Sequence, residues 1–118
     1  MRIQAKAAAR NEYVIDLIDW GFACPGFLYA VMPLCAGGSL KSIIADGVGV
    51  ADAATRLEVM RQLAAGVAGL HADDICHSDL KPANVLLARP VSGPGDVAVR
   101  IADLGSARFL GDTTATQT

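Results

Sequence analysis

A short polar segment in the second half of the chain concentrates the residue types that can do chemistry. Residues 77–84 read His-Ser-Asp-Leu-Lys-Pro-Ala-Asn, so a carboxylate, an ammonium group and a carboxamide follow one another closely. A carboxylate can orient a hydroxyl group and accept its proton. An ammonium group can offset the charge that develops on a transferring phosphoryl group. We therefore expect Asp79 to act as a catalytic base and Lys81 to contact a phosphoryl group.

A second carboxylate, Asp103, is expected to lie beside the end of this segment. Residues 85–87 are apolar and residues 97–101 alternate, which predicts two strands joined by the Gly- and Pro-rich turn at 90–96. Such a hairpin returns Asp103 to the strand end that carries Asn84. Mg²⁺ takes few protein oxygen ligands and keeps water and phosphate oxygens. The sequence therefore predicts a magnesium site at Asn84 and Asp103.

Elements that could position these groups are predicted upstream. Residues 1–10 are rich in Ala and favour a helix. Apolar and β-branched residues predict strands at 13–18 and 27–32, with turn chemistry between them at Gly21 and at 24–26.

Two further helices are predicted before the polar segment. Ser39 can cap a short helix that begins at Leu40. Thr55 and Glu58 have the spacing of a capping box for a longer helix, in which Gly66 and Gly69 are expected to allow close packing. The predicted apolar face of that helix is formed by Leu57, Met60, Leu63, Ala64, Val67 and Leu70.

Composition excludes several classes of protein. The 118 residues are 53% hydrophobic, which fits one compact domain or a piece of a larger one and excludes a disordered chain. The net charge is −2 without a basic block, so we expect no nucleic-acid partner. Pro and Gly interrupt the longest uncharged stretch, 21–40, so we expect no membrane span.

Cysteine usage points to a reducing compartment. The three cysteines are odd in number and form no Cys-x-x-Cys pair, which argues against a disulfide framework or a zinc site. We expect a cytoplasmic location, with the nucleus as an alternative. The Thr-rich polar segment 111–118 is expected to be a mobile tail.

At these residues the chain resembles the eukaryotic-type protein kinases. Residues 77–84 resemble the catalytic loop, and Asp103-Leu104-Gly105 resembles the metal-binding triplet of that family. Lys81, two places after Asp79, is typical of serine/threonine kinases. Residues 28–40 are similar to the fifth strand, the hinge and the helix that follows.

The resemblance implies an α+β, two-lobed kinase fold and ATP-dependent phosphoryl transfer to Ser or Thr of a protein substrate. The chain would carry strands four and five, the hinge, helices D and E, the catalytic loop and strands seven and eight. Residues 1–32 would end the small lobe, 33–38 would form the hinge, and 39–118 would begin the large lobe.

The resemblance also implies a role for individual residues. Asp79 would be the catalytic base, Lys81 would contact the transferred phosphate, and Asn84 and Asp103 would hold Mg²⁺. The adenine of ATP would be contacted by Met32 as gatekeeper, by the Pro33 carbonyl, by the Cys35 amide and by Leu86 beneath the ring. His77 is expected to be a structural residue of the loop.

Several departures from the family pattern bear on activity. Ser78 stands where the family usually has Arg, so we expect no control by a phosphorylated activation loop. Leu104 replaces the usual Phe, and no Gly-rich loop or strand-three Lys occurs in the sequence. We therefore expect a fragment of a kinase domain that is inactive and poorly soluble alone.

Two alternatives remain open. One is a non-catalytic, kinase-like fragment that binds nucleotide or acts as a scaffold. The other is a small-molecule phosphotransferase of the same superfamily, such as an aminoglycoside kinase. Lys81-Pro82 and the Asp103-Leu104-Gly105 triplet favour a protein kinase over the second alternative.

Overall fold

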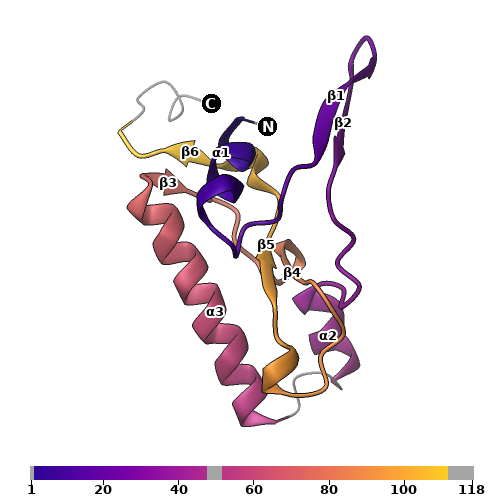
Figure 1. Cartoon of the computed structure of the whole chain (residues 1–118), viewed down its shortest axis with the longest axis vertical. Coiled ribbons are helices and arrows are strands. Elements are labelled where there is room, and N and C mark those ends of the chain that lie inside the picture. The colour runs from indigo at the N-terminus through magenta and orange to yellow at the C-terminus, as the bar shows by residue number, and fades with distance from the viewer. Residues whose placement is uncertain (1, 48–51, 112–118) are drawn as a thin grey trace.

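A short antiparallel ribbon, formed by β4 (Val85–Leu87) and β5 (Val99–Ile101), lies at the centre of the chain. The computed structural model describes residues 2–47 and 52–111. The long helix α3 (Ala53–Ala72) covers one side of the ribbon, and the short helix α2 (Leu40–Asp46) lies on the other (Figure 1). The predicted second hairpin and both helices are therefore confirmed, whereas most of the predicted tail lies outside the described residues.

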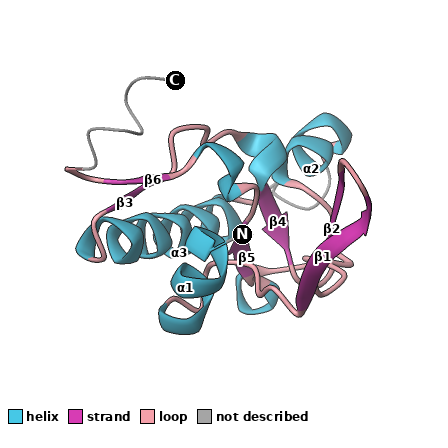
Figure 2. Cartoon of the chain, turned by 90° about the horizontal axis from the view of Figure 1, so that it is seen from above, coloured by secondary structure: helices cyan, strands magenta, loops and turns pink. Residues whose placement is uncertain are grey.

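The other elements surround this centre. Their bounds are α1 Arg2–Arg10, β1 Asp19–Cys24, β2 Phe27–Val31, β3 Ile75–Cys76 and β6 Arg108–Phe109. Figure 2 shows the hairpin of β1 and β2 on the side of the ribbon away from α3. The β3–β6 pair joins the end of α3 to the segment after Asp103. Within the described ranges, no helix is both long enough and apolar enough to cross a membrane.

Both edges of the β4–β5 ribbon are covered. The amide of Ile15 donates to the carbonyl of Ile101, and the amide of Ile101 donates to the carbonyl of Tyr13. On the other edge, residues 36–39 exchange backbone hydrogen bonds with β4. The hydrophobic core is centred on the ribbon. Its buried side chains include Val85, Leu87, Val99 and Ile101 of the ribbon, together with Leu70 of α3 and Ile75 of β3.

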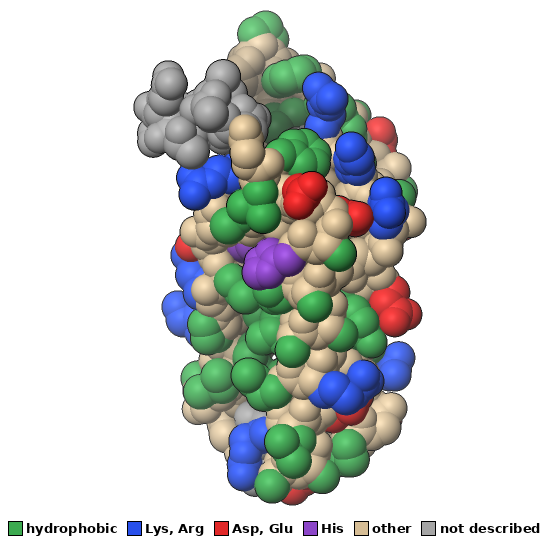
Figure 3. Space-filling view, turned by 90° about the vertical axis from the view of Figure 1, so that its left-hand side faces the viewer, with side chains coloured by type: hydrophobic (Ala, Val, Ile, Leu, Met, Phe, Trp, Pro, Cys, Tyr) green, Lys and Arg blue, Asp and Glu red, His purple; other side chains and the backbone are tan. Residues whose placement is uncertain are grey.

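The predicted buried face of α3 is only partly confirmed. Leu57 and Met60 are 70% and 59% exposed, while Leu63 and Val67 pack partly buried against the core. Leu70 is buried as predicted, and the other buried positions are Thr55, Val59, Gln62 and Gly66. Apolar residues occur all around this helix, so their spacing did not single out one face; Figure 3 shows apolar side chains at the surface on the side that carries α3.

Two residues explain which face of α3 is buried. A Cβ atom on Gly66 would lie 2.8 Å from both Ile101 Cδ1 and Tyr13 Cβ, so the glycine sets the close approach of α3 to the ribbon. Gln62 is buried because its side-chain amide forms the backbone hydrogen bonds that a neighbouring strand would otherwise form at the start of β5. Its Nε2 donates to the carbonyl of Val97 (2.8 Å), and its Oε1 accepts from the amide of Val99 (2.9 Å).

The start of α3 also differs from the prediction. Asp52 is the N-cap, and its carboxylate accepts from both the amide (2.7 Å) and the hydroxyl (2.9 Å) of Thr55. Glu58 binds Arg61 instead of closing a capping box, and the hydrogen bonds from Arg61 lower the pKa of Glu58 to about 2. The cap of α2 is as predicted, because Ser39 Oγ accepts from the amide of Ser42.

The first predicted strand is wrong in position. Residues 13–18 form only a single bridge, between Val14 and Ile101, and the paired strand begins at Asp19. The turn lies at Pro25-Gly26, where Gly26 has a φ of 88°, and Cys24 pairs with Phe27 on either side of it. Gly21 therefore lies inside the strand β1, not in the turn. Large apolar side chains of this hairpin are exposed, including Phe22 (71%) and Phe27 (66%).

Replacing Gly66 by Ala is expected to lower the free energy of unfolding by about 1–3 kcal/mol, because the added methyl group overpacks the interface with β5. This loss exceeds the helix-propensity gain of up to about 1 kcal/mol. Urea unfolding measures the difference. Gly93→Ala is the control, since a Cβ there meets no atom within 4 Å. A more stable Gly66→Ala protein would contradict the close-approach explanation.

The N-cap of α3 is expected to weaken in acid. The hydrogen bond from the Thr55 amide, followed by that from its hydroxyl, lowers the pKa of Asp52 below the ordinary 3.8. Stability from this carboxylate is therefore present above pH 3.8 and is lost as the pH falls through the lower pKa of the folded state. Asp52→Asn, which still caps but does not titrate, should make the acid loss shallower in urea unfolding at successive pH values. Asp46→Asn, at the exposed end of α2, is the control; an equal effect there would contradict the prediction.

Candidate active site

The polar loop 77–84 is held between two paired segments. β3 precedes it and pairs with β6, while a 3₁₀ turn, Pro82–Asn84, leads from it into β4. Ser78 has a φ of 71° and Asp103 a φ of 56°, conformations that side chains other than Gly rarely adopt. Such strain costs roughly 1–2 kcal/mol per residue and persists only where the surroundings fix it. The bonds that fix it here come from His77 and Asn84.

His77 joins the loop to the segment that carries Asp103. Its ring is buried, its Nδ1 accepts from the amide of Asp79 (3.2 Å), and its Nε2 lies 2.8 Å from the carbonyl oxygen of Ala102. Because the Asp79 amide can only donate, Nδ1 carries no proton, and Nε2–H donates to Ala102. The imidazole therefore links the loop to the Asp103 segment, in agreement with the structural role expected for it.

The side chains of Lys81 and Asn84 converge on Asp79. Asn84 Nδ2 donates to the carbonyl oxygen of Asp79 (2.8 Å) and lies 3.5 Å from its Oδ2. Lys81 Nζ lies 3.5 Å from the same Oδ2. The Asp79 and Lys81 side chains are 40% and 55% exposed, so this ion pair adds little stability. The exposure instead leaves both groups accessible to a reactant.

Asn84 and Asp103 lie at the same end of the ribbon, as the hairpin predicts. Val85 pairs with Ile101, and the amide of Ala102 donates to the carbonyl of Asn84 (2.8 Å). With its Nδ2 bound to Asp79, the Asn84 carboxamide keeps its oxygen available as a ligand. Among residues 2–47 and 52–111 no three His, Cys, Asp or Glu side chains form a metal cluster. One carboxylate and one amide oxygen still fit Mg²⁺, which keeps most of its ligands from water and phosphate.

A cavity of about 320 Å³ adjoins Asp103. It is lined by residues 102–105, by Ala30 and Met32 at the end of β2, and by Gln4 of α1. The structure thus brings the predicted gatekeeper Met32 to the same cavity as Asp103. Sequence reasoning missed Gln4, a buried residue whose Nε2 lies 3.3 Å from Met32 Sδ. A polar residue in an Ala-rich helix was the only available signal.

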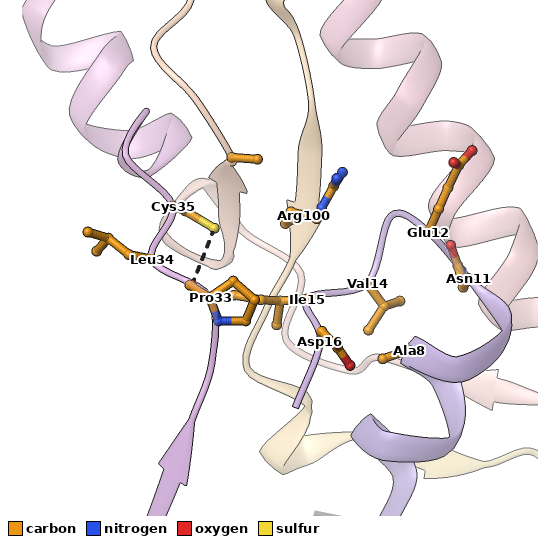
Figure 4. Close-up of a pocket in the computed structure, with 11 residues that line it drawn as sticks. Ala8, Asn11, Glu12, Val14, Ile15, Asp16, Pro33, Leu34, Cys35 and Arg100 are labelled. Atoms are coloured by element: carbon orange, nitrogen blue, oxygen red, sulfur yellow. Dashed lines mark hydrogen bonds between the residues drawn. The ribbon is translucent and has the colours of Figure 1, made fainter. Parts of the chain in front are cut away.

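Pro33 and Cys35 line a separate cavity of about 220 Å³ (Figure 4). The end of α1, residues 14–16 and Arg100 of β5 form its other walls. Burial raises the pKa of the Cys35 thiol, and the nearby Arg100 charge offsets part of that increase. The fourth predicted adenine contact, Leu86, lies in β4 opposite Arg100 and bridges to Ser39. The adenine contacts of these residues remain predictions.

Comparison with known proteins identifies the class to which this fold and site belong. The sequence matches the protein kinase domain family over residues 1–118, and the chain belongs to that family. The resemblance predicted from the catalytic-loop and Asp103 motifs is therefore confirmed, as is the α+β, kinase-like fold.

Individual relatives are serine/threonine kinases by name. The chain is 34% identical over 113 residues to the probable serine/threonine-protein kinase zyg-1 of Caenorhabditis elegans, covering 94% of this chain and 15% of that protein. It is 40% identical to ATG1c of Arabidopsis thaliana (82% of this chain, 13% of that protein) and 34% identical to human ULK1 (86% and 10%). The chain therefore spans between a tenth and a sixth of the length of these relatives.

Replacing His77 by Phe is expected to lower the free energy of unfolding by about 1–3 kcal/mol, because the Asp79 amide and the Ala102 carbonyl lose a partner. Amide hydrogen exchange should also become faster at Asp79. His71→Phe, at an exposed site on α3, is the matched control. An unchanged exchange rate at the Asp79 amide in the His77→Phe protein would contradict the hydrogen-bonded link through His77.

Proposed function

We propose that the chain is the catalytic-loop part of a serine/threonine protein kinase that transfers the γ-phosphoryl group of ATP to a Ser or Thr hydroxyl of a protein. The observation that carries this proposal is the convergence of Lys81 and Asn84 on Asp79. Asp103 lies next to this group, because it directly follows Ala102, whose amide donates to the carbonyl of Asn84. The names of the relatives support the class of acceptor.

Each of these residues has a task in the proposed reaction. Asp79 orients the acceptor hydroxyl and takes its proton while the new oxygen–phosphorus bond forms. At the same time the bond between the γ-phosphorus of ATP and its β,γ-bridging oxygen breaks, and ADP leaves with that oxygen. Lys81, 3.5 Å from Asp79 in the unliganded site, turns to the transferred phosphate and offsets its charge. Asn84 and Asp103 would hold Mg²⁺, which supplies positive charge to the phosphate oxygens when bound.

The rest of the proposal concerns nucleotide position and cellular location. Adenine would be contacted by Met32, the Pro33 carbonyl, the Cys35 amide and Leu86. Residues 1–32 would belong to the small lobe, residues 33–38 to the hinge and residues 39–118 to the large lobe. The cytoplasm or nucleus is the proposed location, which the three unpaired cysteines support.

Replacing Asp79 by Asn is expected to lower the rate of phosphoryl transfer about 10²- to 10⁴-fold, because the base is lost. Mg²⁺-ATP should still raise the melting temperature, since Asp79 is not a proposed metal ligand. Asp103→Asn should remove that Mg²⁺-dependent stabilisation. Both quantities are measured on the full product of the gene that encodes this chain, with radiolabelled ATP and by thermal unfolding.

Asp74→Asn is the matched control, because Asp74 also has a positive φ (59°) yet lies outside the proposed site. Transfer that persists without the Asp79 carboxylate would overturn the proposed mechanism. Mg²⁺-ATP binding without any transfer by the wild-type protein would favour the alternative of a non-catalytic nucleotide-binding protein.

A further inference from the structure

A depression of about 350 Å³ opens beside the loop that carries Asp79. It is lined by Lys41 of α2 together with Lys81, Pro82 and Ala83 of the loop. We propose that this depression selects protein substrates with an anionic side chain, a carboxylate or a phosphate, close to the acceptor hydroxyl. The inference rests on the proposed function, since it assigns the substrate class of the same site.

Lys41 is fixed in position relative to the loop. It lies in the first turn of α2, which Ser39 caps, and Ser39 itself forms a bridge with Leu86 in β4. The amide of Leu87 donates to the carbonyl of Gly38, so the entry to α2 is tied to the strand that follows the loop. The distance between Lys41 and the Asp79 loop is therefore set by backbone hydrogen bonds.

The charge of the depression is positive. Its lining contains two lysines and no carboxylate. Lys81 is engaged with Asp79, whereas no carboxylate of residues 2–47 and 52–111 forms an ion pair with Lys41. Asp46, the acidic residue of α2, is five positions further on and lies about 140° around the helix from Lys41. The charge of Lys41 is thus available to a ligand.

The shape and chemistry of the depression fit one side chain of a bound peptide. Pro82 and Ala83 supply an apolar wall without side-chain donors, against which an aliphatic stem can pack. The Lys41 ammonium group is a point charge that attracts a carboxylate or a phosphate without demanding a fixed orientation. The same charge repels a basic residue, so the depression both favours acidic substrates and rejects basic ones.

The test measures peptide binding separately from transfer, on the full product of the encoding gene. One peptide series has Ala at the acceptor position and places Glu, phosphoserine, Gln or Lys at each site within a few residues of it. Fluorescence anisotropy at low ionic strength should show the Glu and phosphoserine peptides binding about 2- to 5-fold more tightly than Gln at one site, with Lys weaker. Salt should reduce the difference.

Variants assign the effect to Lys41. Lys41→Gln should bring the Glu-to-Gln affinity ratio to about one, and Lys41→Glu should invert it. Arg2→Glu makes the same charge change on the exposed face of α1, far from α2 in Figure 1, and should leave the ratio unchanged. Circular dichroism verifies that each variant is folded.

The outcomes separate this inference from the proposed function. Equal affinity for Glu and Gln peptides, or a preference that survives Lys41→Gln, overturns the inference; transfer to a Gln peptide with a Ser acceptor would then leave the kinase proposal intact. A Lys41-dependent preference without any transfer shows that the depression binds anions but overturns the kinase proposal, and with it the role of the depression in substrate selection. A phosphoserine peptide that binds more tightly than the Glu peptide identifies phosphate as the preferred anion, and equal binding identifies charge alone.

Discussion

The register of β4 against β5 is the constraint on which the candidate site depends. Val85 opposes Ile101, and the next pair of backbone groups, the Asn84 carbonyl and the Ala102 amide, is hydrogen-bonded. A slip of one residue would turn the buried side chains of a strand to the other face, which burial of Val85 and Ile101 prevents. The hydrophobic core thus fixes the relative position of two polar residues that it does not contain.

Hydrogen bonds hold the strained backbone of the polar loop 77–84 and of Asp103 in place. Ser78 and Asp103 occupy left-handed conformations that neither residue prefers. His77, buried between them, joins the Asp79 amide to the Ala102 carbonyl and so makes the loop and the Asp103 segment one unit. The functional side chains therefore need no buried ion pair of their own, and Asp79 and Lys81 remain open to solvent.

Local patterns predicted the site better than they predicted the packing around it. The catalytic-loop spacing and the hairpin to Asp103 involve neighbouring residues and strong turn signals, so both were accessible from the sequence. Most of the buried face of α3 was not, because Gln62 bonds Val97 and Val99, which are 35 and 37 positions away. The single bridge at Val14, in place of the strand expected at 13–18, is likewise set by a distant partner, Ile101.

The hydrogen bonds of Gln62 determine which strand edges of this chain are open to pairing with a further strand. The side-chain amide of Gln62 binds the Val97 carbonyl and the Val99 amide, and Arg100 Nη1 donates to the Val99 carbonyl. Tyr13 and Ile15 bind the amide and carbonyl of Ile101, so this edge of β5 offers no free backbone groups. The β1–β2 hairpin pairs with no third strand in the part of the chain that the structure describes, and its Phe22 and Phe27 are exposed. Unprotected edges of apolar strands recruit further strands. Among the described residues, the β1–β2 hairpin is therefore a ribbon with an edge open to a further strand, while the ribbon that carries Asn84 is closed on both edges.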